Sequence, residues 1–304
     1  WLFAFFGALA GFGIGNGVQA NAMAAALQAS FGVPPLLTGI VAASITLAVL
    51  IGGIELIGRV TQVVVPVMAA VYVIGALIIL VANLDQIPGA LGLIFSNAFN
   101  GEAAAGGSLG VVIQRGIARG VFSNESGLGT APIAQAAAKP GDPVLQGSVA
   151  MIGTFIDTIV ICSMTALVII ISGLYSQADY VSGAKNVSLT INAFGTALPG
   201  FDWIVVFGTV FFTLTTILGW GYYSEKCLEF LAGVKAIRPF RLVWVAVVVF
   251  GAVASGGAVW TIAEILNGLM AIPNLIGLLL LSPVVFRLTN SYDFNNRRQS
   301  PTLR

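Results

Sequence analysis

The side chains best suited to hold a solute lie in one short stretch, residues 119–130, within an otherwise apolar chain. The stretch reads R-G-V-F-S-N-E-S-G-L-G-T and combines serine, asparagine and glutamate with three glycines. Serine and asparagine compete for backbone hydrogen bonds, and each interior glycine costs a helix roughly 1 kcal/mol relative to alanine. The composition therefore predicts a broken helix, in which one half ends near Phe122, residues 123–126 are unwound, and a second half starts at about Gly127.

Such a break would expose backbone groups that can bind charged ligands. Inside a membrane, irregular backbone is tolerated only where protein or a water-filled cavity satisfies it. The end of the second half-helix near Gly127 would offer unpaired N–H groups to a carboxylate, and the freed carbonyls of residues 122–124 would suit a cation. Because few side-chain charges line this region, the pattern favours a small neutral amino acid carried with Na⁺ or H⁺.

Polar side chains in other apolar segments are the next candidates, because such groups inside lipid usually face a pathway or another helix. Gln19 and Asn16 lie three residues apart on one face of the first segment, among glycines that allow close helix packing. We expect Gln19 to contact the ligand. For Asn16, a hydrogen bond between helices and a ligand contact are both open.

The apolar segment at residues 203–231 carries Thr213, Thr215 and Thr216 just before a Gly-Trp pair. A threonine hydroxyl in a helix often bonds back to the carbonyl four residues earlier. Three threonines within four positions exceed that need. They favour ligation of an ion or substrate, since hard cations prefer oxygen ligands.

Two carboxylates also fall within apolar sequence. Asp157 must be paired, protonated or bound to an ion. A buried pair with Arg119 or Arg115 and a role in cation or proton coupling are both open. Glu125 lies in the break, where we expect it to cap free N–H groups rather than touch substrate.

The composition restricts the class of protein. The 304 residues are 58% hydrophobic and 8% charged, whereas soluble domains average about 25% charged residues. Long continuous apolar runs indicate a polytopic all-α membrane protein rather than a barrel of short alternating strands. The net charge of +1 gives no reason to expect nucleic acid, and the absence of histidine excludes Ser–His dyads and His-ligated zinc. The two cysteines lie in different segments and suggest no disulfide or metal site.

The apolar segments predict about eight membrane spans of roughly 20 residues or more. The expected spans are residues 1–31, 36–54, 60–81, the broken 109–138, 144–172, 203–231, 242–254, and a last span ending near Phe286 after a short helix at 260–267. Polar connections are expected at 83–100 and 175–198, and the last span is expected as one helix kinked at Pro273. Because the chain starts at Trp1 deep in apolar sequence, we expect an N-terminal part to precede it.

Charge placement orients these spans. With eight of them, ten basic residues fall on one side and Lys185 on the other, while Arg115 and Arg119 lie in the broken span. This positive-inside bias places the C-terminal tail in the cytoplasm. We expect the protein itself to lie in the inner or plasma membrane. The ten are Arg59, Lys139, Lys226, Lys235, Arg238, Arg241, Arg287, Arg297, Arg298 and Arg304.

Residues 120–138, G-V-F-S-N-E-S-G-L-G-T-A-P-I-A-Q-A-A-A, resemble the signature of the alanine or glycine:cation symporters. The resemblance extends in order to residues 13–21, 155–162, 215–223 and 267–276. It implies a leucine-transporter-like fold of two five-helix inverted repeats, with these spans as core helices three to ten. One transporter domain (1–304) would then hold the remainder of the first repeat (1–83), a connecting loop (84–103), the second repeat (104–288) and a cytoplasmic tail (289–304).

The resemblance also implies roles for individual residues. Thr215 and Thr216 would lie near a sodium site, with Asn16, Asn124, Glu125, Asp157 and Arg119 in support. Ser126 stands where the motif usually has alanine, and the broken helix that should open the first repeat is not among these residues. The side chains that would surround the amino acid are Gln19, Phe122, Ser126, Gly127, Thr216 and Trp220.

The favoured function is a Na⁺-coupled symporter of alanine or glycine that works by alternating access, with Na⁺ as coupling ion and no other cofactor. Its partners would be the amino acid, Na⁺ and the lipid bilayer. One alternative is a proton-coupled permease using Asp157 or Glu125, and another is a substrate-gated channel or sensor. An enzyme is the weakest interpretation, since no nucleophile–base pair is evident.

Overall fold

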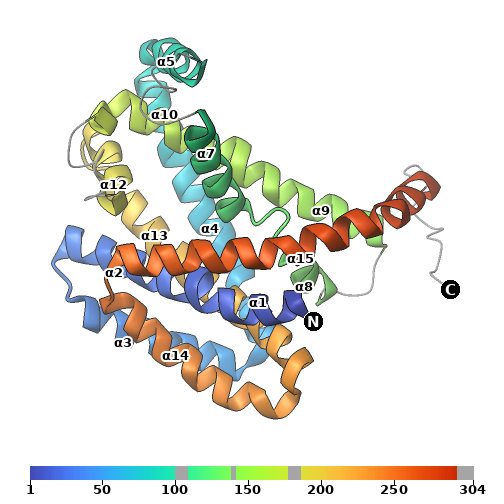
Figure 1. The fold of residues 1–304 in the computed structure, drawn as a ribbon. Coiled ribbons are helices and arrows are strands. Elements are labelled where there is room, and N and C mark those ends of the chain that lie inside the picture. The colour runs from blue at the N-terminus through green and yellow to red at the C-terminus, as the bar shows by residue number, and fades with distance from the viewer. Residues whose placement is uncertain (100–108, 138–141, 177–185, 293–304) are drawn as a thin grey trace.

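The computed structural model describes residues 1–99, 109–137, 142–176 and 186–292, and all regular structure in these ranges is helical (Figure 1). In chain order the helices are α1 (Leu2–Ala10), η1 (Gly11–Gly17), α2 (Val18–Phe31), α3 (Pro35–Ile51), α4 (Gly53–Ala82), η2 (Leu84–Gln86), α5 (Ile87–Phe99), α7 (Leu109–Asn124), α8 (Ala131–Ala136), α9 (Pro143–Phe155), η3 (Ile156–Cys162), α10 (Ser163–Ser172), η4 (Leu174–Ser176), α12 (Asn186–Ala197), α13 (Asp202–Ala232), η5 (Val234–Ala236), α14 (Ile237–Val253) and α15 (Gly256–Ser291).

Some consecutive helices join end to end into one continuous helical rod. Six such rods in the described residues are long and apolar enough to cross a membrane, namely α1–η1–α2, α4, α9–η3–α10, α13, η5–α14 and α15. The all-α polytopic class is therefore confirmed. The sequence predicts eight spans, and the difference has two sources. The apolar helix α3 has only 17 residues, and the broken segment is divided into α7 and α8.

The first rod is the centre of the larger core, where it packs against α13, α14 and α15. Glycines lie where these helices approach most closely. A Cβ on Gly15 would lie 2.1 Å from Cβ of Trp220, and one on Gly13 would lie 3.0 Å from Cα of Ala263. The close packing expected from this glycine-rich stretch is confirmed.

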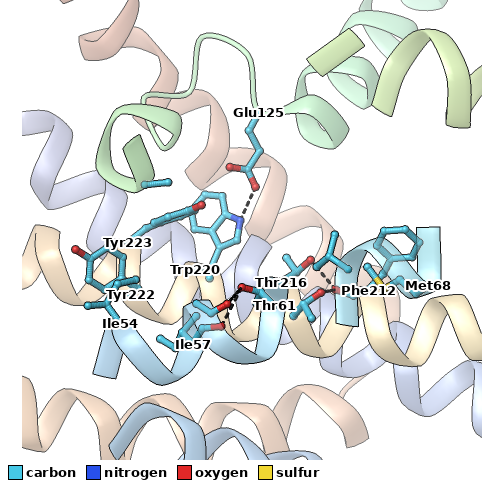
Figure 2. Close-up of a pocket in the computed structure, with 15 residues that line it drawn as sticks. Ile54, Ile57, Thr61, Met68, Glu125, Phe212, Thr216, Trp220, Tyr222 and Tyr223 are labelled. Atoms are coloured by element: carbon cyan, nitrogen blue, oxygen red, sulfur yellow. Dashed lines mark hydrogen bonds between the residues drawn. The ribbon is translucent and has the colours of Figure 1, made fainter. Parts of the chain in front are cut away.

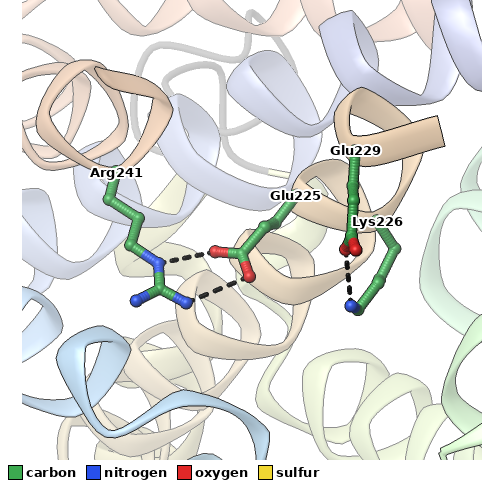
Figure 3. Close-up of polar contacts among 4 residues, drawn as sticks. All are labelled: Glu225, Lys226, Glu229 and Arg241. Carbon is green, nitrogen blue, oxygen red and sulfur yellow. Dashed lines mark hydrogen bonds and ion pairs between the residues drawn. The ribbon is translucent and has the colours of Figure 1, made fainter. Parts of the chain in front are cut away.

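The hairpin between α13 and α14 is closed by an ion pair (Figure 3). Arg241 donates from Nε and an Nη to the two oxygens of Glu225, at 2.6 and 3.0 Å. Glu225 is buried, so the two-point contact compensates a charge that water cannot reach. Lys226, the residue after Glu225, forms a more exposed ion pair with Glu229, one turn further along α13, at 2.6 Å.

A second, smaller core joins α4, α10, α12 and α13. Phe194 of α12 is fully buried there and stacks on Tyr72 of α4, whose hydroxyl is hydrogen-bonded to Thr165 at 2.5 Å. The prediction of a polar connection over residues 175–198 is wrong for its second half. Ile191 and Phe194 lie three residues apart on one face of α12, and their burial outweighs the polar residues around them.

Two more expectations about connections need correction. Residues 83–100 contain η2 and the 13-residue helix α5, which includes the apolar run of residues 90–95. The separate short helix expected at 260–267 is part of α15, which runs unbroken for 36 residues through Pro273. A single last helix is thus confirmed. Residues 100–103 of the expected loop, Lys139, Lys185 and residues 293–304 of the expected tail lie outside the described residues.

Candidate functional site

The predicted helix break is present, between α7 and α8. Residues 125–130 are not helical, and Glu125, Gly127 and Gly129 have positive φ angles of 56°, 79° and 90°. Glycine accepts this conformation freely, whereas a glutamate there costs about 1 kcal/mol or more and must be held by its surroundings.

The boundaries of the break differ from the prediction. Ser123 and Asn124 complete the last turn of α7, and the second helix begins at Ala131, where Pro132 favours a helix start. The expected half-helix end near Gly127 is therefore wrong, because a residue with φ of 79° cannot begin a right-handed helix.

Glu125 connects the break to α13 (Figure 2). One carboxylate oxygen accepts a hydrogen bond from Nε1 of Trp220 at 2.7 Å, and the other accepts from the Thr130 hydroxyl at 2.5 Å. The expected capping of N–H groups by Glu125 is wrong. Asn124 does this instead, since its Oδ1 accepts from the Ser126 N–H at 2.8 Å.

The threonines of α13 bond to their own helix, which is the simpler of the two roles considered. Thr213, Thr215 and Thr216 donate to carbonyls four residues earlier, at 2.7, 2.9 and 2.8 Å. A hydroxyl that has given its proton to a carbonyl still has oxygen lone pairs. The side chains can therefore present acceptors, and not donors, to a ligand.

A cavity of about 420 Å³ lies between α4, α13 and the break, within the size range of small-molecule sites. Thr215, Thr216, Trp220 and Glu125 share its wall, so the structure brings these four predicted residues together (Figure 2). The rest of the wall is mainly apolar: Ile54, Ile57, Gly58, Thr61, Val65, Met68, Ala134, Phe212, Gly219, Tyr222 and Tyr223.

Gln19 lies on the first rod, outside the lining of this cavity. The rod and α13 are antiparallel, with Gly11 against Ser224 and Gly15 against Trp220. Continuing this register by one turn brings Gln19 to the level of Thr216. Its Nε2 donates to the Ile14 carbonyl at 3.0 Å, within the π-helical turn η1.

Asn16 is fully buried and forms the expected bond between helices, with Nδ2 donating to the Trp244 carbonyl of α14 at 2.8 Å. Of its two open roles, the structure thus shows helix-to-helix hydrogen bonding.

Phe122, Ser126 and Gly127 do not line the cavity either. The ring of Phe122 stacks on Trp260 of α15 at 5.0 Å, and Ser126 is exposed. The Gly127 carbonyl accepts from Nδ2 of Asn274, also on α15, at 2.8 Å.

The expected pair between Asp157 and Arg119 is wrong. Arg119 pairs with Glu264 at 2.8 Å and lies over the Trp260 ring, 4.4 Å from its centroid. Asp157 accepts from the Ser123 hydroxyl instead. The side chain of Arg115, the other expected partner, lies outside the described residues.

Sequence reasoning missed the residues of α15 that hold the broken segment, Trp260, Glu264 and Asn274. One signal was present, because Glu264 is the only carboxylate between residues 256 and 291. An acidic residue alone in an apolar span requires a partner. Its proximity to Arg119 depends on the tertiary fold.

A model of the sodium:alanine symporter family matches residues 1–303. The chain belongs to this family. It is 52% identical over 291 residues to the sodium/alanine symporter AgcS of Methanococcus maripaludis, covering 96% of this chain and 64% of AgcS. The resemblance seen in the motifs is confirmed, and the chain is a multi-pass membrane protein of a transporter family and not an enzyme.

Two further relatives come from Bacillus subtilis. The chain is 36% identical over 300 residues to the probable sodium/glutamine symporter GlnT, covering 96% of this chain and 61% of GlnT. It is 34% identical over 291 residues to the putative sodium/proton-dependent alanine carrier protein YrbD, covering 91% of this chain and 60% of YrbD. The chain thus spans less than two thirds of the length of these relatives.

Proposed function

We propose that this chain takes part in the Na⁺-coupled import of a small neutral amino acid, alanine or glycine, by alternating access. Family membership supports symport, and one structural observation supports a site at the break. There the carboxylate of Glu125, in the positive-φ turn, is bound to Trp220 at the wall of a cavity shared with Thr215 and Thr216. Irregular backbone beside a cavity at membrane depth is typical of secondary transporters.

In this proposal the parts have separate tasks. Thr215 and Thr216 offer oxygen lone pairs to Na⁺, because their protons are given to backbone carbonyls. Trp220 and Thr216 contact the amino acid, together with Gln19, Phe122, Ser126 and Gly127 as the break closes around it. Glu125 holds the indole of Trp220 and couples its position to the turn.

The same proposal includes the larger architecture. The described helices would form core helices three to ten of a leucine-transporter-like inverted repeat, with eight spans in all and a cytoplasmic tail in the inner or plasma membrane. Residues 1–83 would complete the first repeat and residues 104–288 would form the second. This assignment rests on the motif resemblance and on the positive-inside bias of the sequence.

Two coupling ions have support, and Na⁺ is preferred. The most similar of the three relatives named above is a sodium/alanine symporter, whereas the name of YrbD includes protons. A proton-coupled permease would use Asp157 or Glu125 as proton carrier. Alanine is preferred to glutamine because the relative named for glutamine is only 36% identical.

The test is uptake of radiolabelled alanine by the full-length protein in proteoliposomes. An inward Na⁺ gradient should drive accumulation, and unlabelled glycine should compete better than glutamine. Uptake that does not respond to Na⁺ but is driven by a pH gradient would show that the coupling ion is H⁺ and not Na⁺. Absence of counterflow exchange, in which internal alanine speeds entry of label, would indicate a channel or sensor instead.

A further inference from the structure

The hairpin between α13 and α14 has an excess of positive charge. Residues 225–242 include four basic and two acidic side chains, which gives a net charge of +2. Both acidic side chains are paired, Glu225 with Arg241 and Glu229 with Lys226 (Figure 3). The excess charge therefore belongs to the two basic residues that these ion pairs leave over.

These two residues are Lys235 in η5 and Arg238 in the first turn of α14. Both side chains are exposed, and neither forms an ion pair or a hydrogen bond with another described residue. Lys235, Arg238 and Arg241 follow one another at intervals of three residues. Helical residues at this spacing lie on one face, so the three cations share one surface of the hairpin.

Arg241 can contribute to this surface while it holds Glu225. Its Nε and one Nη donate to the two oxygens of Glu225. A guanidinium has further N–H donors, and the second Nη of Arg241 points away from Glu225 (Figure 3). These donors remain for a ligand, and phosphate is a group that arginine binds well.

The hairpin lies at a surface of the membrane, because only a few residues join the two spans. α13 ends at Ala232, and the next apolar rod runs from Val234 to Val253. A connection this short between consecutive spans lies at the level of the lipid headgroups. The rings of Trp1 and Phe230 meet near this end of α13, with 5.6 Å between their centroids, and aromatic residues are enriched at this level.

Exposed apolar side chains lie next to the cations in the sequence of the hairpin. Phe230, Val234 and Leu242 are all largely exposed. A free anion would gain nothing from these side chains, whereas a phospholipid has acyl chains that can cover them. Positive charge at headgroup level beside an apolar surface thus matches an anionic phospholipid.

We propose that Lys235, Arg238 and Arg241 bind the headgroup of an anionic phospholipid. The acyl chains of this lipid lie against the exposed apolar side chains of the hairpin, and the lipid stabilises the connection between α13 and α14. This inference goes beyond the proposed function. It is tested by lipid binding and not by transport, so it can fail while the symport proposal stands.

The experiment is thermal unfolding of the full-length protein in detergent micelles, with added phosphatidylglycerol or with phosphatidylcholine that has the same acyl chains. We expect phosphatidylglycerol to raise the unfolding temperature more, and inorganic phosphate to have no such effect. In the double variant Lys235→Gln with Arg238→Gln, the phosphatidylglycerol concentration that gives half of the shift should rise about tenfold or more.

The matched control removes the same charge elsewhere. Arg59→Gln with Arg287→Gln also removes two exposed cations that have no ion-pair partner among the described side chains, and its response to phosphatidylglycerol should equal that of wild type. An equal loss in both double variants would show that the lipid responds to net charge and not to the hairpin, and would overturn the proposal. Equal stabilisation by the two lipids, or by inorganic phosphate alone, would also overturn it.

Single variants cover the case in which the hairpin double variant does not fold. Lys235→Gln and Arg238→Gln each remove one exposed charge and leave the buried pair of Glu225 with Arg241 in place. Each should raise the half-effective phosphatidylglycerol concentration by a smaller factor than the double variant. An unchanged concentration in both single variants contradicts the proposed lipid site.

Discussion

The hydrogen bond between Glu125 and Trp220 is the contact on which the candidate site depends most directly. Trp220 is buried and Glu125 is half-buried, and Glu125 occupies a strained backbone position that the contact helps to hold. Loss of one partner leaves a buried polar group unsatisfied, which costs about 1–3 kcal/mol.

The Trp220→Phe variant tests this contact, because phenylalanine keeps a ring against Gly15 and removes the N–H donor. We expect alanine uptake to fall about tenfold and the unfolding free energy to fall by about 1–3 kcal/mol. Uptake and thermal unfolding in detergent provide the measurements. In Glu125→Gln the amide oxygen can still accept from Trp220, so this control should lose less stability; a greater loss would mean that the carboxylate charge matters more than the bond.

Phe122 and Thr215 separate the proposed roles of substrate and ion. Phe122→Ala removes an aromatic face beside the break, and should raise the half-saturating alanine concentration with little change in Na⁺ activation. Thr215→Ala removes a hydroxyl oxygen from the cavity wall and should do the reverse. Both curves should be recorded for each variant. Equal effects on the two curves would remove this division of roles.

At the scale of the helices, glycines determine how closely two helices can pack. Gly15 gives Trp220 its place against the first rod, since a Cβ there would overlap the tryptophan side chain. The helix α15 has the opposite situation at Gly268, where a Cβ would meet nothing within 4 Å.

This contrast predicts opposite results for two glycine-to-alanine substitutions. Gly15→Ala should lower the unfolding free energy by about 1–3 kcal/mol through overpacking. Gly268→Ala should be neutral or raise it by up to about 1 kcal/mol, because alanine is the better helix former. Thermal unfolding of the full-length protein compares them, and a similar loss in both would show that Gly268 is covered by other parts of the protein.

Composition and local pattern predicted much of the element structure. The break in residues 119–130 followed from its serines and glycines, and the continuity of α15 followed from charge placement. The start of the second half-helix was wrong because conformation at Gly127 and Gly129 depends on contacts with α15, such as that of Asn274. Pairing of Arg119 with Glu264 was missed for a similar reason, since residues so far apart in sequence meet only in the tertiary fold.

At the scale of the whole molecule, the α13–α14 hairpin is held by a charge pair in a largely apolar setting. The side chains of Glu225 and Arg241 are 8% and 24% exposed, so removal of one leaves the other poorly solvated. Breaking a buried pair in this way costs about 3–5 kcal/mol, whereas replacing both partners by apolar residues is often neutral.

We therefore expect Arg241→Met to reduce thermal stability strongly and the double variant Glu225→Leu with Arg241→Met to recover most of it. The more exposed pair provides the control, because Lys226→Met should change stability by about 1 kcal/mol or less. Additive losses in the double variant would show that the two side chains do not act as a unit.

The helix α15 contacts the broken segment at two separate levels. Glu264 and Trp260 contact α7 on the N-terminal side of the break, and Asn274 donates to the Gly127 carbonyl within the break. Ten residues of helix separate Glu264 from Asn274, a span of roughly 15 Å that cannot stretch. A displacement of α15 along its axis must therefore shift both contact points by the same amount. We expect an antibody fragment that immobilises this one helix to hold the turn at Glu125 in place without occupying the cavity.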